Sequence, residues 1–108
     1  MAQDFRNVLV RTIGTGDTTL LVAGNYDAVI GIRCCNILTS TIAVDVKIAK
    51  GGDDYFIAKG VSIPPNSAIE LIQGGAKIVL QSGDTLEAVS DTASSLDVTL
   101  SYIDTISS

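Results

Sequence analysis

The sequence contains no histidine and no tryptophan, and of its 108 residues only two are cysteine and two are proline. Without an imidazole there is no histidine general base, no histidine ligand for a metal, and no Ser-His or Cys-His nucleophile. The commonest kinds of enzyme active site are therefore excluded. We predict a chain that is not an enzyme and that needs no cofactor.

Basic residues are also scarce, since seven Lys and Arg stand against twelve Asp and Glu and the net charge is −5. The basic residues do not cluster, whereas binding to nucleic acids or to anionic membranes needs a basic face. Uncharged runs such as residues 34–44 are too short and too polar to span a membrane. The first six residues lack the basic and apolar regions of a signal peptide. We therefore expect synthesis in the cytoplasm and no nucleic-acid, membrane or small-molecule partner.

The residues that are abundant are those of β-structure. Val, Ile and Thr make up 33 of the 108 residues, and the acidic residues are ten Asp against two Glu. β-Branched side chains fit pleated strands and Asp fits turns, whereas a helical protein would use more Glu, Lys, Leu and Ala. The composition predicts an all-β chain with little or no helix.

Alternation of apolar and polar residues places the strands. Its clearest examples are residues 42–48 and 96–102, each with one apolar face. Seven further segments have strand character: 7–13, 18–22, 28–38, 55–58, 68–72, 77–81 and 86–90. The predicted core includes Ile32, Val44, Val46, Ile48, Val98 and Leu100.

Turn residues separate these segments about every ten residues. Pro64 and Pro65 cannot donate to a sheet ladder, so they are predicted to lie in a loop at a sheet margin. Strands at this spacing predict one domain over residues 1–108, an antiparallel β-sandwich or jelly-roll-like fold of about eight strands.

The two cysteines are adjacent in a strand-like segment. Neighbours in a strand point to opposite faces, so Cys34 is predicted to face the core with Ile30 and Ile32. Cys35 then shares the outer face with Arg33. A vicinal disulfide would distort the peptide link, and a zinc site needs more ligands than the chain offers, so both thiols are expected to be reduced.

The acidic residues offer two candidate sites. Asp53 and Asp54, with Asp84 and Asp91 in other loops, are either solvated turn residues or ligands of a weak cation site, although their spacing is not that of a calcium loop. Glu70 and Glu87 are predicted at outward strand positions. They would act as a glycosidase pair only if they converged in one cleft.

Loss of alternation marks candidate contact surfaces. Val8, Leu9 and Val10 are apolar on both faces of the first strand, and residues 20–22 and 78–80 behave in the same way. Such runs are either buried on both sides or in contact with another chain. We take residues 1–13 as a possible N-terminal contact strand. The candidate interface residues are Phe5, Val8, Leu9, Val10, Arg33 and Cys35.

The order of several phrases resembles that of the small β-sandwich virion proteins of tailed bacteriophages. The phrases lie at residues 28–32, 35–37, 39–46, 54–58, 61–71, 77–86 and 94–102. Together they include the run Cys35-Asn36-Ile37, the segment Ile69-Glu70-Leu71 and the final Leu96-Asp97-Val98 strand, and they cover residues 26 to 104.

This resemblance implies a non-enzymatic structural protein located in the virion. It would be a capsid decoration or cement subunit, or a neck or tail accessory subunit, that forms a homo-oligomer and binds other phage virion proteins. The alternative is a receptor- or carbohydrate-binding module of a tail fibre. That alternative predicts a concave surface patch of Tyr and Asp or Asn that binds sugar. The five aromatic residues are scattered in the sequence and do not favour it.

Overall fold

A computed structural model describes residues 5–24, 26–72 and 77–104 and shows strands without a helix in these ranges. The strands are β1 (Phe5–Ile13), β2 (Thr18–Val22), β3 (Asp27–Asn36), β4 (Ile42–Lys50), β5 (Asp53–Ile63), β6 (Ala68–Glu70), β7 (Ile78–Leu80), β8 (Thr85–Ser90) and β9 (Leu96–Ile103). The predicted all-β fold is confirmed. Residues 1–4 of the predicted contact strand lie outside the described residues.

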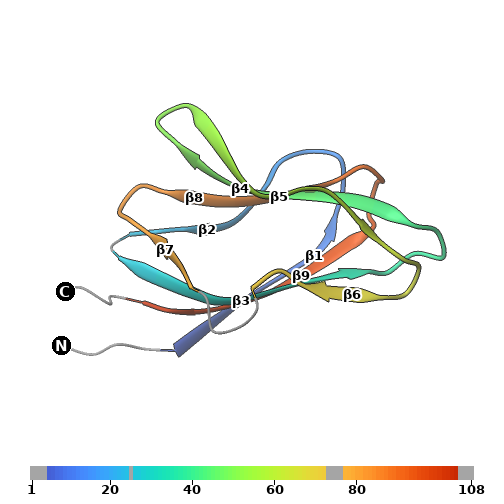
Figure 1. Cartoon of the computed structure of the whole chain (residues 1–108), viewed down its shortest axis with the longest axis horizontal. Coiled ribbons are helices and arrows are strands. Elements are labelled where there is room, and N and C mark those ends of the chain that lie inside the picture. Colours follow the sequence, from blue (N-terminus) through green and yellow to red (C-terminus); the bar gives the residue numbers. More distant parts are fainter. Residues whose placement is uncertain (1–4, 25, 73–76, 105–108) are drawn as a thin grey trace.

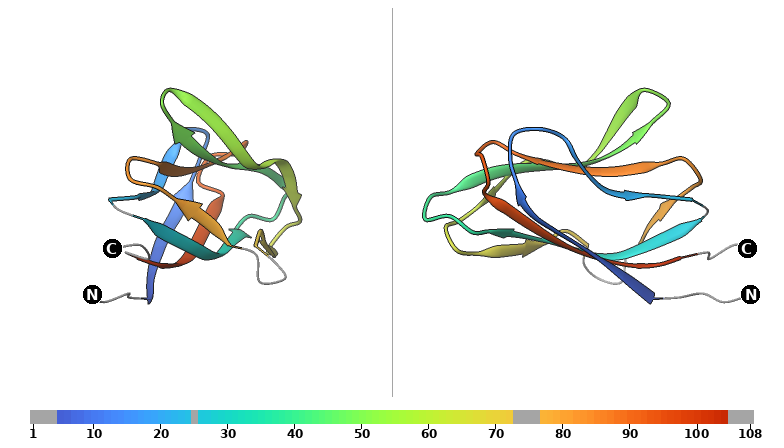
Figure 2. Two further views of the ribbon diagram at one scale, coloured as in Figure 1. Left: turned by 60° about the vertical axis from the view of Figure 1, so that its left-hand side comes forward. Right: turned by 180° about the vertical axis from the view of Figure 1, so that it is seen from behind.

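Two antiparallel sheets are stacked face to face (Figure 1). One has the order β1-β9-β3-β6, with β7 also paired to β3, and the other has the order β2-β8-β4-β5. Successive strands cross between the sheets, except that β4 and β5 are paired in one sheet and β6 and β7 both pair with β3 in the other, which is the topology of a jelly roll with β7 added. Seen from behind, β1 lies in front of β9 at the margin of its sheet (Figure 2).

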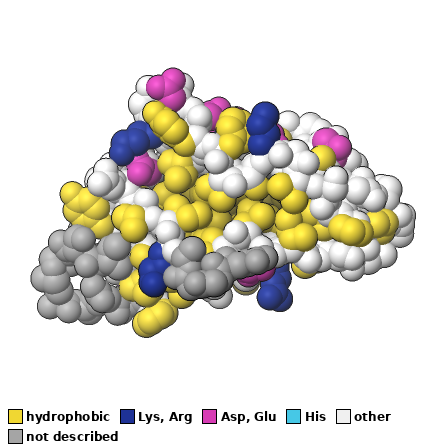
Figure 3. Space-filling view, in the orientation of Figure 1, with side chains coloured by type: hydrophobic (Ala, Val, Ile, Leu, Met, Phe, Trp, Pro, Cys, Tyr) yellow, Lys and Arg dark blue, Asp and Glu magenta, His cyan; other side chains and the backbone are white. Residues whose placement is uncertain are grey.

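The core fills the space between the sheets with the apolar faces of alternating strands. Hydrophobic side chains gather along the middle of the molecule between the two layers (Figure 3). The predicted core residues Ile32, Val44, Val46, Val98 and Leu100 are at most 2% exposed. Ile48 is half-buried and packs against the same cluster.

Strand β5 is the element that the alternation pattern describes least well. It extends over eleven residues rather than the predicted 55–58. Two irregularities in its pairing with β4 leave Ile57, Lys59 and Gly60 without register partners. Gly60 has a φ of +63°, and its N–H donates to Asp45 Oδ1 at 2.7 Å. These bulges break the two-residue period on which the prediction depends.

Buried polar groups join the loops to the strands. The Asn36 side chain is fully buried, and its amide donates to the carbonyl oxygens of Ser40, Ile63 and Pro64 at 2.7 to 3.1 Å. Its Oδ1 accepts from the Leu38 N–H at 2.9 Å. Asn36 thereby holds the loop that contains Pro64, which lies at the sheet margin as predicted.

Candidate functional site

Strand β1 forms an open edge of its sheet. Among the described strands it pairs with β9 on one side and has no strand beyond it. From Phe5 to Val10 every residue has a partner in β9, so this stretch is regular. The register shifts only after Val10, near Thr12, which has a φ of 54°.

The other edges are protected. Strands β6 and β7 are three residues long each and β2 is five, while β5 is long but bulged. Short length and bulges are the usual devices that keep an edge from pairing with another chain. Of the edges in the described part of the chain, β1 therefore offers the longest regular stretch of main chain.

The six candidate interface residues lie on both faces of this sheet. Phe5 and Leu9 face outward and are 77% and 68% exposed. Leu9 pairs with Thr99, and Thr99 pairs with the exposed Arg33, so these residues form a row across three strands. Cys35 is half-buried on the same face.

Val8 and Val10 are instead half-buried and pack against the core, because alternation along β1 turns them inward. Their role as contact residues stays a prediction. The run 78–80 also follows alternation, with Leu80 buried and its neighbour Val79 exposed. In the run 20–22 an irregularity in the pairing between Thr19 and Leu21 interrupts alternation, so Leu20 is buried while Val22, two residues further on, is exposed. Burial on both sides, the other interpretation of these runs, is wrong for them.

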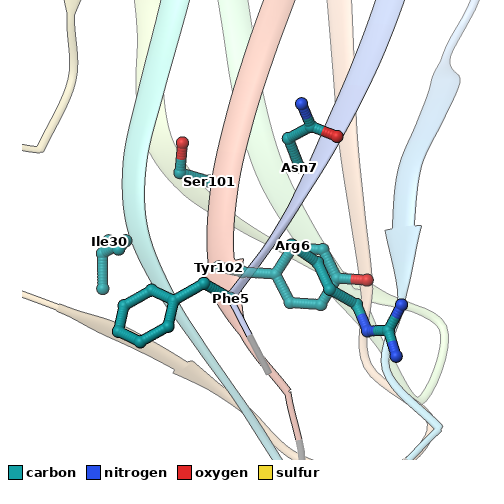
Figure 4. Close-up of a pocket in the computed structure, with 6 residues that line it drawn as sticks. All are labelled: Phe5, Arg6, Asn7, Ile30, Ser101 and Tyr102. Carbon is teal, nitrogen blue, oxygen red and sulfur yellow. The ribbon is translucent and has the colours of Figure 1, made fainter. Parts of the chain in front are cut away.

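Next to the edge, the outer face of the sheet is hollowed. The hollow has a volume of about 660 Å³ and is lined by Phe5, Arg6, Asn7, Ile30, Ser101 and Tyr102. Phe5, Ile30, Asn7 and Ser101 project to one side of the strands, whereas the Tyr102 ring and the Arg6 side chain project to the other (Figure 4). The guanidinium of Arg6 is paired with the Asp104 carboxylate. The side chains presented to the hollow are therefore uncharged.

A bulge in β3 brings Ile30 into this hollow. Val29 pairs with Tyr102 and Gly31 pairs with Ser101, so Ile30 has no partner in β9. The extra residue shifts the alternation, and Ile30 lies on the side of Ser101 rather than in the core (Figure 4). The prediction that Ile30 faces inward with Ile32 is therefore wrong. Ile32 and Cys34 are fully buried as predicted.

Gly31 carries no side chain, so only main chain lies beside Ser101 at this point of the hollow. A Cβ placed there would lie 3.7 Å from Glu70 Oε2 and 3.9 Å from the Ser101 Cβ. Glu70 Oε2 accepts from the Ile32 N–H at 2.7 Å, and Glu70 Oε1 lies 3.9 Å from Arg33 Nε. Glu70 thus faces outward as predicted, but its carboxylate is engaged by the backbone and by arginine.

Cys34 and Cys35 are free thiols on opposite faces of β3, as predicted. Burial, with a smaller contribution from the charge of Glu70, raises the pKa of the Cys34 thiol to about 12. A thiol with so high a pKa carries almost no thiolate at neutral pH, which makes Cys34 unreactive.

Three of the four acidic residues predicted as turn residues or cation ligands, Asp54, Asp84 and Asp91, make contacts with other residues of the chain. Asp54 lies 3.1 Å from Lys47 Nζ, whose pKa is raised by hydrogen bonds to Asp17 first and Asp54 second. Asp84 is buried and lies 3.4 Å from Lys50 Nζ. No group of three or more Cys, Asp or Glu side chains within the described ranges could hold a metal ion.

The two glutamates do not form the glycosidase pair that the sequence left open. Glu70 belongs to β6 and Glu87 to β8, which are in different sheets, so they do not converge as a glycosidase pair would. Asp91 is a turn residue whose carboxylate accepts from the Ala43 N–H at 3.1 Å. Across the described part of the chain, none of the elements is a helix long and apolar enough to cross a membrane.

Comparisons with known proteins add little to this picture. No family model and no curated protein matches the chain. Among solved structures, it is similar to a chain of the Bacillus endospore appendages, which form a family of disulfide-linked pili. The identity is 16%, the match covers 98% of this chain and 88% of the other, and the TM-score is 0.49. A likeness at this level carries no argument about function.

Proposed function

We propose that the chain is a non-enzymatic structural subunit of a phage virion, either a capsid decoration or cement subunit or a neck or tail accessory subunit. In this role the chain is located in the virion, where it binds other copies of itself and other virion proteins. The open edge of β1 is the observation that supports this proposal most strongly.

The edge fits such a role for a physical reason. An unpaired strand presents a row of main-chain N–H and C=O groups that another chain can continue as a sheet. The regular stretch Phe5–Val10 also carries two large exposed apolar side chains, Phe5 and Leu9. A strand added beside β1 would cover both and would exchange hydrogen bonds with β1 at the same time.

The topology supports the proposal at the level of analogy. Jelly rolls occur in viral capsid proteins and in lectins, and one fold serves many functions. The sequence resemblance to phage virion proteins favours the first of these. The symmetry of the assembly would separate the possible locations: copies spread over a lattice indicate the head, and a ring on the particle axis indicates neck or tail.

The experiment compares the sedimentation of the purified chain with that of two lysine variants. Leu9→Lys puts a charge on the open edge, a common natural protection against edge pairing. Thr99→Lys puts the same charge directly opposite, on the interior strand β9. We expect concentration-dependent association of the unmodified chain, its loss in Leu9→Lys, and its retention in Thr99→Lys.

Other outcomes contradict the edge contact. If both variants lose association equally, the outer face rather than the edge of β1 makes the contact. If Leu9→Lys associates as the unmodified chain does, β1 is not involved. Far-ultraviolet circular dichroism of both variants controls for folding, which should be retained because both positions are exposed.

A further inference from the structure

The hollow beside β1 combines two kinds of surface. Phe5 and Ile30 supply an apolar wall, and Phe5 is 77% exposed. Asn7 and Ser101 supply an amide and a hydroxyl that project to the same side as this wall (Figure 4). Within the described residues neither polar side chain has a hydrogen-bond partner.

We propose that this hollow binds a neutral saccharide. A sugar ring carries hydroxyl groups on its edges and has apolar C–H faces. It can therefore rest one face on the Phe5 ring while its hydroxyls exchange hydrogen bonds with Asn7 and Ser101. The proposal is distinct from the assembly role described above: edge pairing uses the main chain of β1 and would cover Phe5, so the hollow is offered by the chain before it associates.

The charges around the hollow favour a neutral ligand. Arg6 is directed away from it and is paired with Asp104, so none of the described lining residues presents a free cation to a phosphate or a carboxylate. The Glu70 carboxylate beyond Gly31 is itself engaged by the Ile32 N–H and by Arg33. A purely apolar ligand is disfavoured too, because it would remove Asn7 and Ser101 from water without replacing their hydrogen bonds.

The backbone allows a close approach. Asn7, Ser101 and Gly31 lie in one row across β1, β9 and β3. Gly31 contributes no side chain to this row, and a glycine within a strand is a common mark of a place where a ligand approaches the main chain. The volume of about 660 Å³ is within the usual range of roughly 300 to 1,000 Å³ for small-molecule sites.

The test is a nuclear magnetic resonance titration of the ¹⁵N-labelled full chain with three separate probes: methyl α-D-glucoside, methyl β-D-galactoside and the methyl glycoside of N-acetylglucosamine. Sodium sulfate is the anionic control. We expect at least one glycoside to shift the amide signals of Phe5, Asn7, Gly31 and Ser101 in a saturable way. Sulfate should not shift them.

Three variants test the assigned residues. Phe5→Ala should weaken binding about tenfold and Asn7→Ala roughly threefold to tenfold, as expected for one aromatic contact and one hydrogen bond. Leu9→Ala is the matched control, since it removes a similarly exposed apolar side chain from the same strand and face. It should bind as the unmodified chain does.

The proposal is overturned if none of the glycosides shifts these signals, or if the shifts fall elsewhere in the chain. It is also overturned if Phe5→Ala and Asn7→Ala bind the glycoside unchanged. Finally, the same amides could shift on dilution of the unliganded chain while no glycoside affects them. The hollow would then receive a second copy of the chain instead of a sugar.

Discussion

Cys34 and Cys35 are neighbours in the chain but differ in their surroundings. Cys34 is fully buried, and Cys35 is half-buried on the outer face. We predict that Ellman's reagent modifies one thiol per folded chain at neutral pH, and that Cys35→Ser abolishes this reaction. Cys34 should react only after the chain is unfolded in urea. Equal reaction rates of the two thiols in the folded chain would show that Cys34 is not protected by the core.

Cys34 also affects the stability of the chain at alkaline pH. The folded chain raises the pKa of Cys34 from 9.0 to about 12, so folding favours the protonated thiol. The contribution of Cys34 to the unfolding free energy is fully present below pH 9.0 and is lost as the pH rises from 9.0 towards about 12. In urea unfolding, Cys34→Ala should show a smaller loss of unfolding free energy over this interval than the unmodified chain. An identical loss in both would assign the alkaline dependence to other groups.

Asp91 makes the stability of the chain fall as the pH is lowered, which is the opposite direction to the effect of Cys34. Its pKa lies below 3.8 because the carboxylate accepts a hydrogen bond from the Ala43 N–H first and from the Thr92 hydroxyl second. The stabilisation is therefore present above pH 3.8 and is lost as the pH falls through the folded-state value. Asp91→Asn keeps an acceptor but removes the charge, so its unfolding free energy should vary less with pH in this range. Urea unfolding above and below pH 3.8 measures the difference, and equal slopes would contradict it.

At the scale of elements, Asn36 joins the end of β3 to the loop between β5 and β6. Replacing it with Leu leaves up to three carbonyl oxygens without their donor, at a cost of about 1 to 3 kcal/mol for each buried group. We expect Asn36→Leu to lower the unfolding free energy by several kcal/mol. Asn7→Leu, on an exposed position of β1, should change it by about 0.5 kcal/mol or less. Chemical unfolding of the two variants compares them, and similar stabilities would show that the buried amide is not needed.

The strands themselves are largely predictable, because a two-residue period is a local property of the sequence. The segments 42–48 and 96–102 correspond closely to β4 and β9. The alternation underestimates β5 because bulges interrupt its period. It places Ile30 on the wrong face for the same reason. A bulge depends on pairing with another strand, so the sequence of one strand does not reveal it.

The hollow cannot be predicted from the sequence at all. Phe5, Ile30 and Ser101 are far apart in the sequence, and only the pairing of β1 with β9 and of β9 with β3 brings them together. Phe5 is recognisable as a candidate contact residue because it lies between polar neighbours, and Leu9 because it belongs to a run that is apolar on both faces. Their partners across the sheet follow from register, which composition and alternation do not specify.

At the scale of the whole molecule, one core between two sheets supports both proposed surfaces. Leu100 is fully buried on the interior strand β9, between β1 and β3. Leu100→Asp places a charge in this core, which costs several kcal/mol against a total stability of roughly 5 to 15 kcal/mol. We expect it to prevent folding, as judged by circular dichroism. Ser101→Asp, its half-buried neighbour on the opposite face, should remain folded. If Leu100→Asp folds as stably as Ser101→Asp, the core does not lie where the structure places it.

Hydrogen exchange of the main chain tests the central claim most directly, since it reports on the edge of β1 itself. Amides that gain a hydrogen-bond partner on association exchange more slowly. Mass spectrometry of the unmodified chain at low and high concentration should show new protection in peptides that contain Phe5–Val10. The other exposed edge, β5, should be unchanged. Association without any slowing of exchange in β1, or with new protection confined to β5, would contradict assembly through this edge.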